Sequence, residues 1–288
     1  MLFLIVYYLY TRKTQVSTLF FHIAEISFWQ YIKCMNWPDE FLTLDKRSMD
    51  PAGRQPYKVT QQYLQHKHRI LLPPSLVKDR SILDVGSCLG ATGWYSLSND
   101  CRIYLGLEMQ AWFCDRSKEL LSAHPRQDWQ IANNSLQTYM TFDRNHYDII
   151  VAWGVLNGLY DPIPALEWMM KRSDVVSLDL PIPHSATDEL AHCSIDLNPN
   201  SSMIAAGEAA SFVFTGSRIG LGAIQIVANL NGFDLDMQSY DQLRSVLPDY
   251  YGTGSQYRRM GINLIRSDTT LPKLDNSYRN LQKENWGE

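Results

Sequence analysis

The stretch Ser81-Ile82-Leu83-Asp84-Val85-Gly86-Ser87-Cys88-Leu89-Gly90-Ala91-Thr92-Gly93 decides the fold class. A largely apolar run that carries one acid is followed by three glycines within eight residues. This pattern predicts a buried strand, a tight turn and the start of a helix. Glycine permits positive φ and lets the backbone approach a ligand closely. In an open α/β sheet such a turn lies at the carboxyl end of a strand, where ligands bind.

The glycine spacing argues against a nicotinamide or flavin site, whose fingerprint is G-x-G-x-x-G. Here the glycines follow G-x-x-x-G-x-x-G, and Cys88 stands where a middle glycine would be. The stretch resembles motif I of the class I methyltransferases that use S-adenosylmethionine (SAM), which usually reads D/E-x-G-x-G-x-G. Asp84, Gly86 and Gly90 match this motif, and Cys88 departs from it. The resemblance extends over about residues 55–266.

A second acid ends the next expected strand, because the run C-R-I-Y-L-G-L-E closes at Glu108. A carboxylate at this tip can accept hydrogen bonds from both ribose hydroxyls, and its distance from the glycine turn fits one helix plus one strand. The alternative is a solvated carboxylate at a strand end. In the resemblance, Asp84 orients the cofactor through the turn. The residues expected to bind SAM in this half of the sheet are Asp84, Gly86, Ser87, Cys88, Gly90, Glu108 and Met109.

Composition indicates an ordinary soluble domain with additions. The chain has 288 residues, of which 45% are hydrophobic and 19% charged, and a net charge of −4. This charge gives no support to a broad nucleic-acid-binding face. The five cysteines show neither a C-x-x-C pair nor zinc spacing, which predicts free thiols in a reducing, cytoplasmic compartment and no metal site.

Residues 1–54 are predicted to be an N-terminal extension and lead-in, before a methyltransferase domain over 55–268 and a polar tail over 269–288. The apolar run of residues 2–10 is shorter than the roughly 20 residues that span a bilayer as a helix. It also lacks the basic region and cleavage site of a signal peptide. Three interpretations stay open: a helical cap, a weak anchor at a membrane surface, or an upstream extension from a start codon misassigned before Met35.

Strand and helix patterns alternate along the domain, which predicts a parallel sheet with crossover helices. Strands are expected at 81–85, 103–107, 129–132, 147–153 and 174–180, with helices at 57–72, 92–98, 110–123, 135–141 and 162–172. Residues 181–216 lack periodicity and are expected to form a long loop over the acceptor site. A helix over 217–231 is then expected, followed by strands at 233–240 and 258–266 without a helix between them.

That final order is typical of the class I methyltransferase fold. The predicted fold class is therefore α/β. It is a Rossmann-like seven-stranded methyltransferase sheet, mostly parallel, with an antiparallel C-terminal hairpin and an N-terminal helical extension.

The fourth expected strand leads into W-G-V-L-N-G-L-Y-D-P, residues 153–162. This segment is similar to the branch that includes the tRNA wobble-uridine carboxymethyl-transferring enzymes, which often read G-V-L-Y-H-L-x-D-P. Asn157 and Gly158 replace the tyrosine and the histidine of that pattern. We therefore carry over the fold and SAM, but neither tRNA as substrate nor carboxylated SAM.

In these enzymes the tip of the fourth strand lies beside the methionine part of SAM and the acceptor. Trp153 is therefore expected to bind the cofactor and Asn157 to act in catalysis, the alternatives being a core aromatic and a turn residue. Asn134 and Ser135 follow the third strand, where the resemblance places the adenine, although Ser135 is also a favoured helix N-cap. His184, or else His192, is a candidate general base in the loop after the fifth strand.

Methyl transfer from a sulfonium mainly requires the acceptor to be oriented, so no strong catalytic constellation is needed. The leading hypothesis is a SAM-dependent methyltransferase that acts on an oxygen or nitrogen of a small molecule, a sugar or a nucleic acid base. A small-molecule or glycan acceptor is favoured over tRNA because of the net charge. The alternatives are a non-catalytic binding or scaffold protein with this fold, and a nicotinamide oxidoreductase.

Overall fold

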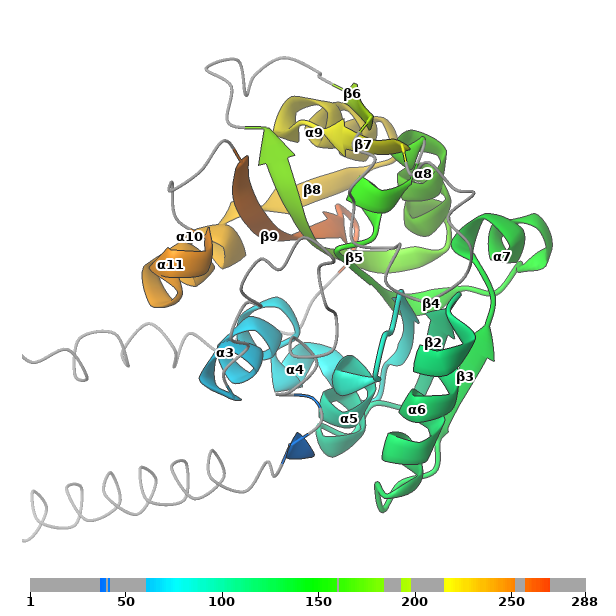
Figure 1. The fold of residues 1–288 in the computed structure, drawn as a ribbon. Coiled ribbons are helices and arrows are strands. Elements are labelled where there is room, and N and C mark those ends of the chain that lie inside the picture. Colours follow the sequence, from blue (N-terminus) through cyan, green and yellow to red (C-terminus); the bar gives the residue numbers. More distant parts are fainter. Residues whose placement is uncertain are drawn as a thin grey trace, which may run out of the picture. The chain divides into compact units, whose positions relative to one another are not determined.

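A seven-stranded sheet, with strand order β3-β2-β1-β4-β5-β9-β8, forms the centre of the fold (Figure 1). Strands β1 to β5 are parallel, and β9 runs antiparallel between β5 and β8. This arrangement confirms the predicted fold class. The strands are β1 (Ser81–Val85), β2 (Ile103–Glu108), β3 (Trp129–Asn133), β4 (Tyr147–Trp153), β5 (Ser173–Pro183), β8 (Phe233–Asp236) and β9 (Tyr257–Arg266).

The computed structural model describes residues 37–39, 41, 61–159, 161–183, 193–197, 215–251 and 257–269. The chain divides into compact units of residues 1–38 and 39–288, and the sheet belongs to the second. The predictions for most of the extension over 1–54, for His184 and His192, and for the tail beyond residue 269 lie outside the described residues. Within the described ranges, no helix has both the length and the apolar character needed to cross a membrane.

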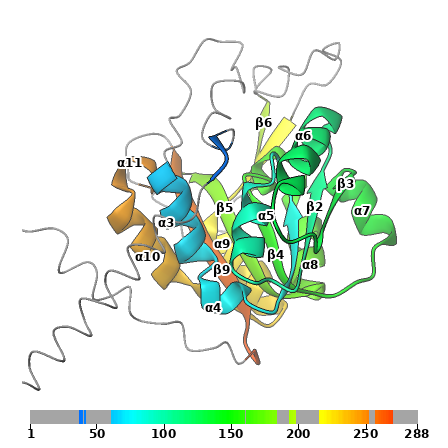
Figure 2. The same cartoon turned by 90° about the horizontal axis from the view of Figure 1, so that it is seen from below.

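Helices cover both faces of the sheet. In Figure 1, α3, α4 and α5 lie below it and α8 and α9 above it, and Figure 2 shows α3 beside α10 and α11. The larger apolar core lies between the sheet and α7, α8 and α9, and a smaller one joins α3, α10 and α11. The helices are α3 (Gln61–Leu71), α4 (Pro74–Val77), α5 (Ala91–Ser98), α6 (Ala111–Ser122), α7 (Leu136–Phe142), α8 (Pro162–Lys171), α9 (Leu221–Leu230), α10 (Met237–Val246) and α11 (Pro248–Tyr251), with a 3-10 turn η1 (Leu156–Gly158).

The predicted loop over 181–216 and the predicted helix over 217–231 are both wrong in part. Strand β5 continues to Pro183, and β6 (Cys193–Leu197) pairs antiparallel with β7 (Thr215–Ile219) in a separate two-stranded sheet. Helix α9 begins only after Gly220, whose extended backbone (ψ 160°) separates strand from helix. Pairing with a distant strand, rather than local propensity, decides the structure of residues 215–219.

The predicted strand over 233–240 is also too long, because Asp236 caps a helix. The Asp236 carboxylate accepts hydrogen bonds from the backbone N–H groups of Gln238 (3.1 Å) and Ser239 (3.4 Å), the geometry of an N-cap. Helices α10 and α11 therefore lie between β8 and β9, and the prediction of two strands without an intervening helix is wrong. The antiparallel pairing of these two strands is confirmed, with Phe233 opposite Arg266.

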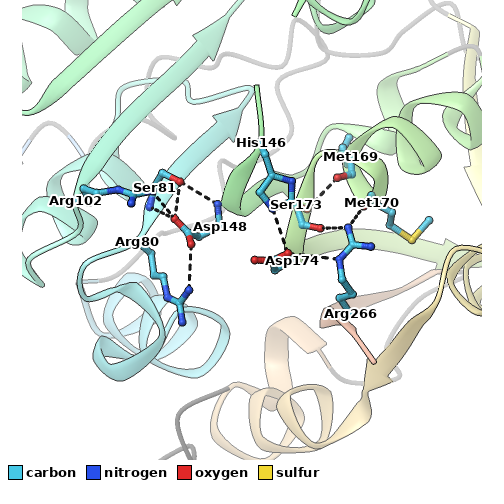
Figure 3. Close-up of polar contacts among 10 residues, drawn as sticks. All are labelled: Arg80, Ser81, Arg102, His146, Asp148, Met169, Met170, Ser173, Asp174 and Arg266. Carbon is cyan, nitrogen blue, oxygen red and sulfur yellow. Dashed lines mark hydrogen bonds and ion pairs between the residues drawn. The ribbon is translucent and has the colours of Figure 1, made fainter. Parts of the chain in front are cut away.

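Two acids tie the amino ends of the strands together, at the edge opposite the glycine turn (Figure 3). The Asp148 carboxylate accepts hydrogen bonds from the backbone N–H (2.8 Å) and the hydroxyl (2.6 Å) of Ser81. Arg80 (3.0 Å) and Arg102 (2.9 Å) also donate to it. On the neighbouring strand, Asp174 contacts His146 and Arg266. These contacts join β1, β4, β5 and β9 and stabilise the fold.

We expect Asp148→Asn to lower the free energy of unfolding by about 1–2 kcal/mol at pH 7, because a partly buried charged hydrogen-bond network is weakened. Burial alone would raise the pKa of Asp148, but the hydrogen bonds from Ser81 and Arg80 and the charge of Arg102 hold it below the ordinary value of 3.8. The stabilisation is therefore present above pH 3.8 and is lost as pH falls through the lower folded-state pKa.

Urea denaturation at several pH values measures this loss. The difference between Asp148→Asn and the wild type should shrink towards pH 3, while Asp115→Asn, on the exposed side of α6, should change little at any pH. An equal loss at pH 3 and pH 7 would contradict the electrostatic explanation.

Candidate functional site

The turn that follows β1 is fixed to β2 through its backbone. The N–H groups of Gly86 and Ser87 both donate to the carbonyl oxygen of Leu107, at 2.7 and 3.1 Å. Gly86 is exposed and has φ +70°, and a Cβ atom at this position would lie 2.7 Å from Cγ2 of Val155. Both the backbone angle and the neighbouring side chain therefore require glycine at position 86.

Cys88 occupies the left-handed region (φ +51°) without being glycine, a conformation that costs an L residue roughly 1–2 kcal/mol. Its N–H donates to Oε2 of Glu108 at 2.9 Å. Gly90 precedes α5 with φ +83°, and a Cβ atom there would lie 3.1 Å from Leu121 of α6. Cys88 thus departs from motif I in sequence, but its backbone keeps the left-handed conformation of the turn and is strained by it.

Glu108 ends β2 with its carboxylate against the turn. Oε2 accepts from Cys88, and Oε1 accepts from the N–H of Gln110 at 2.8 Å. Burial raises the pKa of Glu108, and the backbone N–H groups of Gln110, Cys88 and Met109 oppose that rise. An ionised carboxylate has about four acceptor positions, so it can take hydroxyl donors beside these amides. The remaining acceptor positions of the Glu108 carboxylate therefore fit the hydroxyl groups of a ribose such as that of SAM.

The predicted adenine-side residues lie next to Glu108. The N–H of Asn134 donates to the carbonyl of Glu108 at 3.0 Å, and Nδ2 of Asn133 donates to the carbonyls of Glu108 (3.0 Å) and Met109 (3.1 Å). Ser135 caps α7, since its Oγ accepts from a backbone N–H three residues on at 3.1 Å, and the predicted N-cap is confirmed. Met109 is 52% exposed beside them. The ends of β1, β2 and β3 thus bring these predicted residues to one edge.

Asp84 and Ser87 hold the turn from the side of the sheet. Oδ2 of Asp84 accepts from the hydroxyl of Tyr104 at 2.7 Å, and the Tyr104 ring occupies the space that Gly93 leaves by lacking a side chain. Burial raises the pKa of Asp84 to about 7, although the hydrogen bond from Tyr104 opposes the rise. The side chain of Ser87 likewise occupies space that Gly106 leaves by lacking a side chain.

Trp153 and Asn157 lie at the carboxyl end of β4. Nε1 of Trp153 donates to the hydroxyl of Ser177 at 3.0 Å, and its ring packs against the smaller core. Asn157 lies in η1, and its Oδ1 is buried without a hydrogen-bond partner among the residues that the structure describes. Leaving a buried acceptor unsatisfied costs about 1–3 kcal/mol, which a ligand that donates a hydrogen bond would recover.

The structure contains a buried ion cluster beside Trp153 that the sequence patterns did not predict. The Asp179 carboxylate, on β5, is fully buried and accepts from Nε (2.6 Å) and a terminal nitrogen (3.1 Å) of Arg259. Lys67, on α3, contacts the same carboxylate, and its Nζ lies 4.2 Å from the centroid of the Trp153 ring. Burial alone would raise the pKa of Asp179, but Arg259 and Lys67 outweigh burial and hold it below its ordinary value. We call these residues the Lys67–Asp179–Arg259 cluster.

His68 completes the surroundings of Trp153. Its Nδ1 lies 2.7 Å from the carbonyl oxygen of Leu64, its Nε2 lies 3.3 Å from the hydroxyl of Thr92, and its ring centroid is 4.8 Å from that of Trp153. Burial lowers the pKa of His68 to about 3, so the ring is neutral at physiological pH.

The sheet register puts these groups on one face. Trp153 is opposite Asp179, and Asp84 is opposite Gly106. Glu108 lies two residues after Gly106 on the same strand and therefore shares its face. A polar row therefore follows the carboxyl edge from β2 to β9. Such a row, beside an exposed glycine turn, can hold a polar ligand across several strands.

Comparison with known proteins supports this fold. No family model and no curated protein matches the sequence. Among solved structures, the N-terminal domain of EvdMO1 with SAH (S-adenosylhomocysteine) bound matches with a TM-score of 0.55 and 12% identity, over 81% of this chain and 99% of that one. A protein from Listeria monocytogenes, described as a SAM-dependent methyltransferase, matches with a TM-score of 0.51 and 10% identity, over 70% and 97%. The chain therefore has the class I methyltransferase fold.

Proposed function

We propose that this protein is a SAM-dependent methyltransferase that moves a methyl group to an oxygen or nitrogen of a small-molecule or glycan acceptor. The observation that carries the proposal is the Glu108 carboxylate, bonded to the N–H of Cys88 in the glycine turn. The position of this acid at the tip of β2, beside the turn in a sheet of this strand order, supports a role for Glu108 in binding a ribose.

SAM supplies a methyl group on a sulfonium, which is already a good leaving group. The chain's residues therefore have to hold the cofactor and orient the acceptor. With the cofactor bound, Glu108 would accept hydrogen bonds from the ribose hydroxyls, and the turn at Gly86 would leave room for the amino-acid end. Oδ1 of Asn157 would accept a hydrogen bond from the O–H or N–H group that is to be methylated and would orient that group, whose proton would pass to solvent.

Titration calorimetry with SAH tests the proposal. We expect the wild type to bind SAH and Glu108→Gln to bind it about 10- to 100-fold more weakly, because one of the two accepting oxygens is replaced by an NH2 donor. Glu119→Gln, on the exposed side of α6, is the matched control and should bind as the wild type does. The absence of SAH binding by the folded wild type would rule the proposal out.

A non-catalytic binding protein with this fold is the second candidate, and the strained Cys88 in the turn favours it. Incubation with methyl-labelled SAM and fractionated cell extract separates the two candidates. Label transferred to an extract fraction supports the enzyme, whereas SAH binding without transfer to any fraction supports the binding protein.

A further inference from the structure

Gly158, in η1, is a glycine that neither the backbone nor the packing requires. Its φ lies outside the left-handed region that favours glycine. Apart from its chain neighbours, no atom of the described residues lies within 4 Å of the position that a Cβ atom would take there. Gly86 differs on both counts, because its φ is +70° and a Cβ atom there would meet Val155. Gly158 therefore leaves an open space that a side chain could enter without strain.

The residues around Gly158 hold η1 in place. Leu156 and Leu159, on either side of it, are both buried in the larger apolar core. The N–H of Gly158 donates to the carbonyl oxygen of Val155 at 2.8 Å, and strands β5 and β7 pack against η1. A larger side chain at position 158 would therefore fill the open space rather than displace the backbone.

The open space adjoins two parts of the candidate site. Asn157, the preceding residue, carries the buried Oδ1 that has no partner among the described residues. Val155, to which Gly158 is hydrogen-bonded, adjoins the glycine turn, because its Cγ2 lies 2.7 Å from the position that a Cβ atom would take at Gly86. A ligand group that donates a hydrogen bond to Asn157 therefore has room beside it, at Gly158, for the atoms that carry that group.

We propose that Gly158 sets the size of the methyl acceptor, because its missing side chain leaves room for the ring or branched chain that carries the methylated group. This inference rests on the function proposed above. A hydroxyl or amine on a ring has a substituted carbon on each side, whereas a group at the end of a linear chain needs no such room. The open space at Gly158 therefore favours a ring-bearing small molecule or a sugar over a short linear acceptor.

The variant Gly158→Cys measures the open space without reference to activity. We expect its new thiol to react with methyl methanethiosulfonate and with the bulkier benzyl methanethiosulfonate at rates that differ by less than about tenfold, because reactivity follows exposure. Peptide mass spectrometry separates this modification from that of the native thiols, and the buried Cys114 of α6 should stay unmodified. Modification of position 158 by the small reagent alone would overturn the inference.

Substitutions of increasing size test whether the acceptor uses the space. The assay measures transfer from methyl-labelled SAM to the extract fraction that accepts label. We expect Gly158→Ala to lower kcat/KM for that fraction about two- to threefold and Gly158→Trp to lower it about 10- to 100-fold, because the side chain excludes the acceptor. Both variants should bind SAH within about threefold of the wild type. Lys118→Trp, on the exposed side of α6, should transfer label as the wild type does.

Two results would separate a failure of this inference from a failure of the proposed function. If the wild type transfers label to no fraction, the proposed enzymatic function fails and the inference falls with it. If the wild type transfers label and Gly158→Trp does so equally well, the function stands and only the role of Gly158 is lost. A folded Gly158→Trp protein that no longer binds SAH would also overturn the inference. Circular dichroism checks folding, and Gly158→Leu replaces Gly158→Trp if the latter is unfolded.

Discussion

Asp179→Asn is expected to lower the free energy of unfolding by about 3–5 kcal/mol, the largest effect of any substitution considered. The variant leaves Lys67 and Arg259 side by side without the carboxylate that both contact. The loss of one partner from a buried ion cluster costs more than the cluster contributes, because the remaining charges stay buried and repel each other. Urea denaturation followed by circular dichroism measures the loss.

Two further variants separate this explanation from a general effect on the sheet. Asp234→Asn, on the exposed side of β8, should change the free energy of unfolding by less than about 0.5 kcal/mol. Adding Lys67→Met to Asp179→Asn removes one uncompensated charge and should restore part of the stability. A double variant that is less stable than Asp179→Asn would show that charge is not the cause.

Gly86→Ala is expected to abolish detectable SAH binding and to lower the free energy of unfolding by about 2–4 kcal/mol. Two causes add, since φ is +70° and the new Cβ would lie 2.7 Å from Cγ2 of Val155. The turn must then shift, and the N–H of Cys88, which donates a hydrogen bond to Glu108, shifts with it. Calorimetry with SAH and thermal denaturation measure the two effects.

Gly232→Ala is the matched control, because Gly232 has φ +73° with no atom within 4 Å of the new Cβ. It should cost only the roughly 1–2 kcal/mol of the backbone conformation and leave SAH binding unchanged. Val155→Ala combined with Gly86→Ala should recover stability, since it removes the clashing methyl group. Equal losses in Gly86→Ala and Gly232→Ala would show that the contact with Val155 has no part in the effect.

The first five strands were predictable because local patterns define them. Apolar runs bounded by glycine, asparagine or aspartate place β1 at residues 81–85 and β4 at 147–153, as observed. Residues 215–219 were not predictable, because they form a strand only through pairing with residues 193–197. Asp236 did carry a usable signal, since a capping side chain can end a strand and start a helix.

The residues of the candidate site also fall into a predictable group and an unpredictable one. Gly86, Cys88, Glu108 and Asn134 follow strand ends that the sequence reveals, and the structure brings them together. The Lys67–Asp179–Arg259 cluster unites residues from α3, β5 and β9, and no local pattern connects them. Asp179 alone gave a sign, because an acid inside the apolar run V-V-S-L-D-L must find a partner when the strand is buried on both faces.

Helix α3 makes contacts with residues that lie far along the sequence, which affects the order in which the chain can fold. Nδ2 of Asn263 donates to the carbonyl of Leu71 across 192 positions of sequence, and Lys67 meets Asp179 and Arg259 at the same seam. A chain emerging from the ribosome makes α3 early but cannot complete this seam until β9 has been synthesised. We therefore expect the nascent chain to form its glycine turn first and to complete the surroundings of Lys67 only when β9 is available to pack against α3.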